Sequence, residues 1–200
     1  MAKKPLLDIQ PLTRDRWQDL ETLFSGPGGS QVRGCWCMYY RRSGNTPKPE
    51  GSMTYAERNQ CDLKALVDKG VVPGLIGYRD GEPVAWVSLG PREDYHKLLR
   101  SPVMKPVDAK PVWSVVCFFT AKAARGEGLS AAMLEGAAAY ARAQGATLLE
   151  AYPVDKPGRG DDDNLWFGVK ALYDRAGFVE VARRKPTRVV MRKALTPTRG

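Results

Sequence analysis

The segment from Val115 to Ser130 constrains the fold of this chain more than any other stretch. The apolar run at 115–119 predicts a buried strand, and after a short turn Gly126 and Gly128 mark the start of a helix. Free N–H groups at a helix N-terminus bind phosphate oxygens, and glycines let a phosphate approach the backbone without a side chain in the way. The segment therefore predicts a strand–turn–helix unit that holds a diphosphate-bearing ligand by its main chain.

This unit continues into a strand–helix–strand crossover. We expect a strand at 112–119, an Ala-rich helix at 129–144 that ends at Gly145, and a strand at 147–152 parallel to the first. Two hairpins flank the crossover, with strands expected at 75–79, 83–89, 178–183 and 188–192. This order predicts an α/β (α+β) fold with a mixed, mostly antiparallel twisted sheet, a central βαβ crossover and flanking helices.

The chain length favours a single domain over residues 1–200, with a substantial core. Residues 1–70 are expected to form an N-terminal strand at 6–12, helices at 13–24 and 54–69, and long loops. Residues 71–193 are expected to form the ligand-binding core. That part also contains a short helix at 92–99 and a helix at 165–176 that ends at Gly177.

Charge and cysteine content narrow the classes of function. The formal net charge is +9, but the basic residues are scattered, so binding to nucleic acid is disfavoured. No apolar run is long enough to span a bilayer and the N-terminus has no signal-peptide pattern, so we expect a cytoplasmic protein with no membrane partner. The four cysteines, including Cys35 and Cys37 in a C-x-C pattern, are expected to be reduced, and no metal site is expected.

Two motifs give the chain a resemblance to a known family. Residues 125–130 read Arg-Gly-Glu-Gly-Leu-Ser and resemble the Arg/Gln-x-x-Gly-x-Gly/Ala cofactor motif of the GNAT N-acetyltransferase superfamily, with serine at the sixth position. Tyr173 stands a few residues before Gly177-Phe178, as in the C-terminal signature of that superfamily. The blocks at 34–41, 90–92 and 149–155 look like a little-characterised bacterial branch. The resemblance covers residues 75–193 and implies a GNAT-like fold.

The resemblance implies acetyl-CoA as the acyl donor, without a metal. The diphosphate would lie on the N–H groups of the 125–130 turn, and the pantetheine arm would pair with the strand before it while the 147–152 strand splays away. A weaker match upstream of Tyr173 adds an asparagine. The residues implied in cofactor binding are Phe118, Phe119, Thr120, Arg125, Gly126, Glu127, Gly128, Leu129, Ser130 and Asn164.

The resemblance further implies acetyl transfer to a primary amine of a small molecule or peptide, by direct attack in a ternary complex. Tyr173 is the implied acid that protonates the departing CoA thiolate, and its structural alternative is packing of the last helix. A strand N–H near Phe118 or Phe119 would stabilise the oxyanion.

The attacking ammonium must first lose a proton, and the base is less defined. Glu150, on the splayed strand, is our candidate, although its face could equally point into helix packing. Glu82 and Asp94 are alternatives near the acceptor side, and a chain of water molecules is another.

Four residues are candidates for binding the acceptor. Trp36 and Tyr39, together with Tyr40, could wall an acceptor pocket or pack as a lid or core. Arg92, which follows Gly90-Pro91, could clamp an acceptor carboxylate or lie at the surface.

Other functions remain open beside the transferase. A non-catalytic acyl-CoA sensor or regulatory domain needs the 125–130 turn but neither an acid nor a base. A nucleic-acid or protein-binding module would use the net positive charge. A thiol switch would use Cys35 and Cys37. The sequence does not define the acceptor, and a homodimer is one open oligomeric state.

Overall fold

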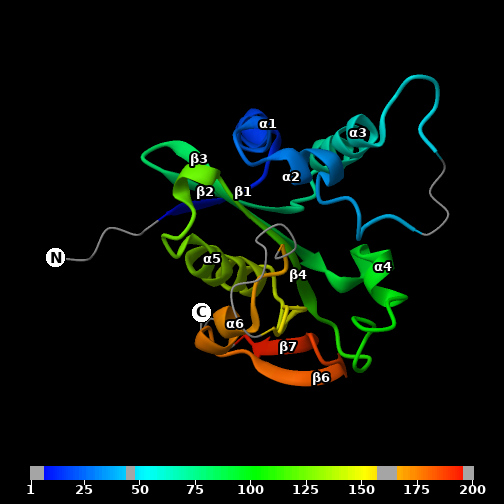
Figure 1. Ribbon diagram of the computed structural model, residues 1–200, viewed down its shortest axis with the longest axis vertical. Helices are drawn as coiled ribbons and strands as arrows, with labels where there is room; N and C mark the ends of the chain where they lie inside the picture. The colour runs from blue at the N-terminus through cyan, green and yellow to red at the C-terminus, as the bar shows by residue number, and fades with distance from the viewer. Residues whose placement is uncertain (1–6, 44–47, 157–165, 196–200) are drawn as a thin grey trace.

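A computed structural model describes residues 7–43, 48–156 and 166–195 of the chain (Figure 1). Its centre is a seven-stranded sheet with the order β1-β2-β3-β4-β5-β7-β6. The strands are β1 (Asp8–Pro11), β2 (Gly74–Arg79), β3 (Glu82–Pro91), β4 (Trp113–Thr120), β5 (Leu148–Ala151), β6 (Val179–Lys185) and β7 (Arg188–Ala194). All neighbours pair antiparallel except β4 and β5, which are parallel. The mixed sheet with one central crossover is thus confirmed.

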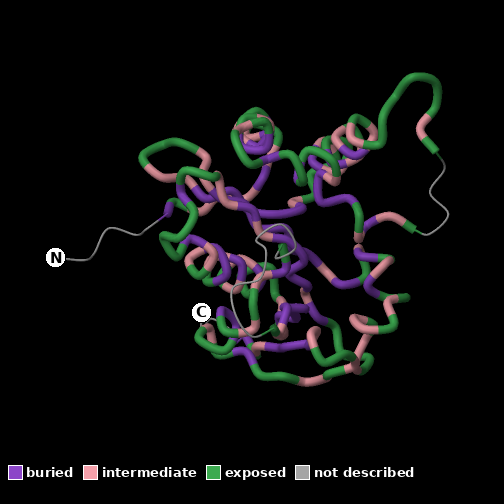
Figure 2. Tube along the Cα trace, viewed as in Figure 1, coloured by how far each residue is buried: buried purple, intermediate pink, exposed green. Residues whose placement is uncertain are grey.

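Helices cover both faces of the sheet (Figure 1). On one face lie α1 (Trp17–Ser25), α2 (Ser30–Cys35) and α3 (Tyr55–Asp68), and on the other lie α5 (Leu129–Ala143) and α6 (Lys170–Arg175). The short α4 (His96–Leu99) follows β3. Each face has its own apolar core, and the buried parts of the tube in Figure 2 follow the sheet and the inner sides of the helices.

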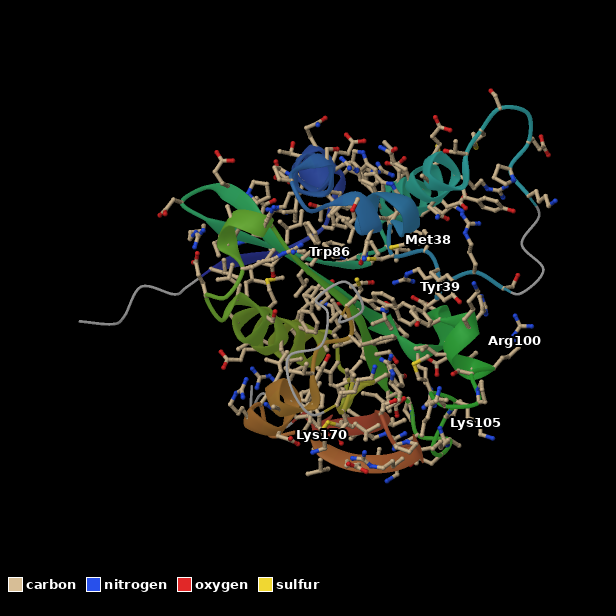
Figure 3. The ribbon with its side chains drawn as sticks, in the orientation of Figure 1. Met38, Tyr39, Trp86, Arg100, Lys105 and Lys170 are labelled. Atoms are coloured by element: carbon tan, nitrogen blue, oxygen red, sulfur yellow. The ribbon has the colours of Figure 1, made fainter. Side chains whose placement is uncertain are left out.

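The core between the sheet and helices α1 to α3, the upper core, is rich in aromatic residues. Trp86 of β3 is fully buried between the sheet and the α1–α2 layer (Figure 3), and its ring meets the Phe24 ring edge-on with 5.9 Å between centroids. Phe24 also packs edge-on against Phe119 of β4, at 5.8 Å. This packing fixes α1 and the following α2 above the middle of β4.

Local sequence signals explain the helix ends. Thr54 caps α3 by accepting from the Glu57 N–H at 3.2 Å, while the Glu57 carboxylate accepts from the Thr54 N–H at 2.7 Å. Gly128 caps α5 with φ +77°, and Gly145 follows that helix with φ +85°. Both backbone conformations favour glycine.

Strands β4 and β5 diverge after a short parallel contact. Their register pairs residues 113–115 with 149–151 and then stops, although β4 continues to Thr120. Opposite β3 the register moves from Cys117 to Val115, which leaves Val116 as the extra residue of a β-bulge. The splayed strand expected from the resemblance is therefore present, and the bulge lies where the two strands part.

Two expectations about helices are corrected. The last helix was expected at 165–176, but among the described residues α6 begins only at Lys170, and Trp166 and Phe167 precede it in a turn. The helix α2 was not expected, because residues 25–30 were interpreted as a loop and no helix was assigned to the residues that follow. Packing of Val32 into the aromatic core favours this short helix nonetheless.

Candidate functional site

The turn between β4 and α5 leaves a row of main-chain donors open. Gly126 and Gly128 have φ of +83° and +77°, and a Cβ at either position would meet no atom within 4 Å. Among the described residues, no carbonyl accepts a hydrogen bond from the N–H groups of 126–130. The positive end of the α5 dipole lies at the same place. The turn therefore has the geometry of an anion-binding helix start.

A cavity of about 810 Å³ opens over this turn. It lies between residues 118–120 of β4, the turn and the segment that leads into α2. Eight of the ten residues assigned to cofactor binding from the sequence line it: Phe118, Phe119, Thr120, Arg125, Gly126, Gly128, Leu129 and Ser130. Glu127 instead forms an ion pair with Arg79. Asn164 lies outside the described residues.

Arg125 joins two parts of this cavity wall. Its Nε donates to the Thr120 carbonyl at 3.3 Å and its Nη2 to the Gly28 carbonyl at 3.5 Å. Pro27 and Gly28 line the cavity together with Arg125, although we did not assign them from the sequence. The only signal was the Gly- and Pro-rich run at 26–29, which we interpreted as a loop.

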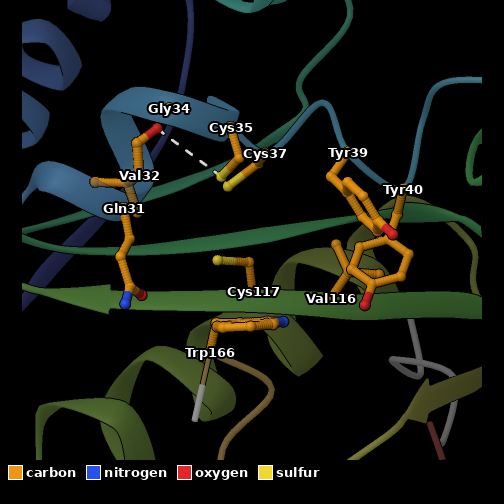
Figure 4. A pocket seen from close by; sticks show the side chains of 10 residues that line it. All are labelled: Gln31, Val32, Gly34, Cys35, Cys37, Tyr39, Tyr40, Val116, Cys117 and Trp166. Carbon is orange, nitrogen blue, oxygen red and sulfur yellow. Dashed lines mark hydrogen bonds between the residues drawn. The ribbon is translucent and has the colours of Figure 1, made fainter. Parts of the chain in front are cut away.

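A second cavity, of about 550 Å³, adjoins the first (Figure 4). Gln31, Val32 and Trp166 line both cavities. The bulge residue Val116 and its neighbour Cys117 form part of the wall of the second cavity, whereas the next residues of β4 line the first. The remaining wall comes from α2 and the chain after it: Gly34, Cys35, Cys37, Tyr39 and Tyr40.

The segment before α6 occupies the space between the diverging strands. The Trp166 carbonyl accepts from the Phe118 N–H of β4 at 2.7 Å, and the Gly168 carbonyl accepts from the Val154 N–H, beyond β5, at 3.0 Å. The Phe167 ring is buried and packs edge-on against Tyr152, with 5.9 Å between centroids. Residues 166–168 thus bridge the two sides of the splay in this conformation.

Tyr173 lies in the other core, between the sheet and helices α5 and α6. Its side chain is fully buried, its hydroxyl donates to the Phe167 carbonyl at 2.7 Å, and its ring meets that of Phe118 at 6.4 Å. Burial raises the pKa of Tyr173 well above its ordinary value. The hydroxyl is therefore a protonated donor close to β4, but it does not line either cavity.

Glu150 belongs to a buried ionic network. It lies opposite Arg192 of β7, whose Nε donates to its Oε2 at 2.7 Å, and the Tyr152 hydroxyl donates to its Oε1, also at 2.7 Å. Arg92 is 3.5 Å from the same carboxylate and donates to the carbonyls of Asp108 and Lys110. Glu150 and Arg92 are buried and line neither cavity. The two residues therefore contact each other instead of the cavities.

Of the three aromatic candidates for acceptor binding, Tyr39 and Tyr40 line a cavity and Trp36 does not. Tyr39 lines the apolar cavity, and its ring is half exposed and meets Tyr40 edge-on at 4.9 Å. Trp36 is buried and stacks on Trp17 with 5.7 Å between centroids. Its backbone, with φ +44°, ends α2. Trp36 therefore belongs to the aromatic core and not to the cavity wall.

The cysteines are all unpaired thiols. The pKa of Cys35 is raised, chiefly by the hydrogen bond of its thiol with Cys37 and then by burial. The pKa of Cys37 is raised as well, first by a hydrogen bond with Cys117. Protonated thiols are poor nucleophiles, which weighs against the thiol switch considered from the sequence.

Two other classes of site were searched for in the same ranges. Over residues 7–43, 48–156 and 166–195, no group of three or more His, Cys, Asp or Glu side chains is placed to hold a metal ion. In that part of the chain, no helix is both long and apolar enough to cross a membrane.

The chain was compared with known protein families and with curated proteins. A sequence model of the acetyltransferase (GNAT) family matches residues 36–178. No curated protein matches the chain in sequence.

Solved structures share the fold at low sequence identity. A GNAT-family acetyltransferase from Streptococcus agalactiae aligns with a TM-score of 0.55 at 11% identity, over 94% of this chain and 95% of that chain. A polyamine N-acetyltransferase from Drosophila melanogaster, which forms N-acetylagmatine, gives 0.51 at 14%, over 94% and 100%. A structure of the NatC complex bound to Gag peptide and CoA gives 0.50 at 10%, over 95% and 99%.

Proposed function

The chain belongs to the acetyltransferase (GNAT) family, and on this basis we propose that it transfers an acetyl group from acetyl-CoA to a primary amine of a small molecule or peptide. The transfer would be a direct attack in a ternary complex. The observation that carries the proposal is the pair of adjoining cavities on consecutive residues of β4, Cys117 in one and Phe118 in the other. Donor and acceptor can then meet at one point of the strand.

The larger cavity fits the donor. Its turn has open space at Gly126 and Gly128 and unpaired N–H groups, which suit the diphosphate of acetyl-CoA. Arg125 adds a positive charge at the cavity wall. The bound donor supplies an acetyl group activated as a thioester.

Phe118 is the proposed main-chain donor to the thioester oxygen. Successive N–H groups of a strand point to opposite sides, and that of Phe118 points to the open side, where it now meets the Trp166 carbonyl. The N–H of Phe119 then points towards β3. Of the two residues considered from the sequence, Phe118 is therefore the better placed to stabilise negative charge on that oxygen.

Tyr173 remains the proposed acid. In the reaction, the amine nitrogen forms a bond to the acetyl carbon, the carbon–sulfur bond breaks, and the sulfur takes a proton. The Tyr173 ring packs against Phe118, and its raised pKa keeps the hydroxyl protonated. For the hydroxyl to reach the sulfur, its bond to the Phe167 carbonyl must open.

The proton of the ammonium has two proposed routes. Glu150 could receive it through the Tyr152 hydroxyl, which already donates to the Glu150 carboxylate at 2.7 Å. Water entering from the cavity could carry it instead. The ion pair of Glu150 with Arg192 favours water, because a proton on that carboxylate would disrupt a buried ion pair.

The test is thiol release from acetyl-CoA in the presence of amines and peptides. The transferase proposal predicts amine-dependent release together with an acetylated product of matching mass. Tight binding of acetyl-CoA without turnover would favour the sensor function instead. We further propose a cytoplasmic location, which fits the four free thiols, and leave the oligomeric state to sedimentation.

A further inference from the structure

The walls of the 550 Å³ cavity restrict the chemistry of the acceptor. Of the described residues that line it, none has a charged side chain. Its polar groups are the Gln31 amide, the two tyrosine hydroxyls, the Trp166 indole and three thiols, and the pKa values of two of these thiols, Cys35 and Cys37, are raised. A cation that entered this space would lose its hydration and gain no carboxylate partner from the described part of the wall.

A smaller cavity of about 350 Å³ adjoins this one. The two share Gly34, Cys35 and Tyr39, so Tyr39 stands between them. The walls of the smaller cavity include Arg42 and Lys97. An acceptor whose amine reaches Cys117 and whose body fills the apolar cavity would direct its far end towards these two cations.

Lys97 is the cation at this end without a counter-charge. Its Nζ lies 3.5 Å from the centroid of the Tyr39 ring, and among the described residues no carboxylate lies within ion-pair distance of it. Arg42, in contrast, is paired with Asp62 at 2.6 Å and with Asn59 at 2.8 Å. Desolvation and the neighbouring Arg42 and Arg100 charges lower the pKa of Lys97, as expected where positive charge is in excess.

We infer that the acceptor carries its amine on an apolar body of aromatic size, and that its far end is neutral or negatively charged rather than positively charged. Polyamines and guanidinium-bearing amines are then poor acceptors, because their second cation would meet an uncharged wall and an unpaired lysine. This inference rests on the proposed function and narrows its substrate class.

Three probes with the same aminoethyl head test the inference. They are 2-phenylethylamine, its para-carboxylate 4-(2-aminoethyl)benzoate, and its para-aminomethyl derivative, which carries a second cation. We expect kcat/KM, measured by thiol release, to be at least about tenfold higher for the neutral and anionic probes than for the dication. A dication that is used equally well or better overturns the inference and leaves the proposed function intact.

A charge reversal at Lys97 tests whether this residue causes the selectivity against a second cation. Lys97→Glu should raise the ratio of dication to anionic probe by about tenfold or more, since the far end then meets a carboxylate. Lys105→Glu is the matched control, because Lys105 is exposed on the loop before β4, away from Tyr39 in Figure 3, and its variant makes the same change of net charge. Equal ratios in the two variants overturn the assignment. Binding of acetyl-CoA without thiol release from any probe, polyamine or peptide overturns the proposed function and this inference with it.

Discussion

The backbone N–H of Phe118 donates to the carbonyl of Trp166 at 2.7 Å. The next carbonyl, that of Phe167, accepts the hydroxyl of Tyr173, also at 2.7 Å. Two consecutive carbonyls therefore hold the two donors on which the proposed chemistry depends. In the proposed reaction, binding of acetyl-CoA would replace the first of these bonds, and protonation of the thiolate by Tyr173 would replace the second.

This relationship predicts that Trp166 competes with acetyl-CoA for the backbone N–H of Phe118. Trp166→Ala should loosen residues 166–168 and tighten acetyl-CoA binding by about twofold to tenfold, because more of the protein is then in the open state. Isothermal calorimetry measures this. Val169→Ala is the control, since Val169 lies in the same segment, is equally exposed and lines neither main cavity. Weaker binding by the Trp166 variant would mean that the indole contacts the bound donor.

The glycine turn predicts an effect on acetyl-CoA binding that can be separated from an effect on stability. Gly126→Ala places a Cβ in the open space of the turn, and we expect acetyl-CoA to bind at least about tenfold more weakly, since the phosphate can no longer approach. Gly145→Ala is matched to it, because Gly145 has a similar φ of +85° and equally open surroundings at the far end of α5. Each variant should lose about 1–2 kcal/mol of stability from backbone strain. Equal acetyl-CoA affinity in both variants would refute a main-chain phosphate site at 126–130.

Removal of the Tyr173 hydroxyl tests the acid. Tyr173→Phe should lower kcat on the order of 100-fold with little change in acetyl-CoA affinity. It should also cost about 1 kcal/mol of folding free energy, because the buried Phe167 carbonyl loses its donor. Since burial raises the pKa of Tyr173, the wild-type rate should show no loss from this group up to about pH 10. An unchanged kcat in the variant removes Tyr173 from the mechanism.

The buried network predicts a stability effect at Glu150. Glu150→Gln leaves Arg192 and Arg92 without their shared carboxylate, and we expect a loss of about 3–5 kcal/mol in urea unfolding. The same change at Glu180, whose ion pair with Arg183 lies at the surface, should alter stability little. If the folded Glu150 variant keeps the wild-type kcat and pH profile, Glu150 is not the base.

The ion pair of Asp108 with Arg192 predicts that folding stability falls in acid. Hydrogen bonds from Arg192 are the main cause that lowers the pKa of Asp108 to about 2, below its value in the unfolded chain. A depressed pKa stabilises the fold above the unfolded value, and this contribution is lost as pH falls from about 4 to about 2. Asp108→Asn should therefore be less stable than wild type at pH 6, with the difference closing towards pH 2. Urea unfolding as a function of pH measures this, and a difference independent of pH would contradict it.

Local sequence was enough for the donor half of the site. The apolar run before the turn, the glycines at positive φ and the Ala-rich helix are short-range features, so their pattern alone predicts the β4–α5 unit and its open N–H groups. The parallel pairing of β4 with β5 follows from the crossover between them. The eight predicted residues that line the larger cavity all belong to this unit.

The acceptor half was decided by contacts between distant parts of the chain. Glu150 and Arg192 meet because the sheet order places β5 beside β7, and Lys97 meets Tyr39 because α4 packs next to the chain after α2. Periodicity assigns a side chain to a face but not to a partner, so it could not tell that Glu150 is buried or that Trp36 packs in the aromatic core. The sequence by itself therefore determined the strand–turn–helix that can hold a diphosphate. Only the tertiary structure decided which side chains face the second cavity, because burial and charge pairing depend on which elements the sheet brings together.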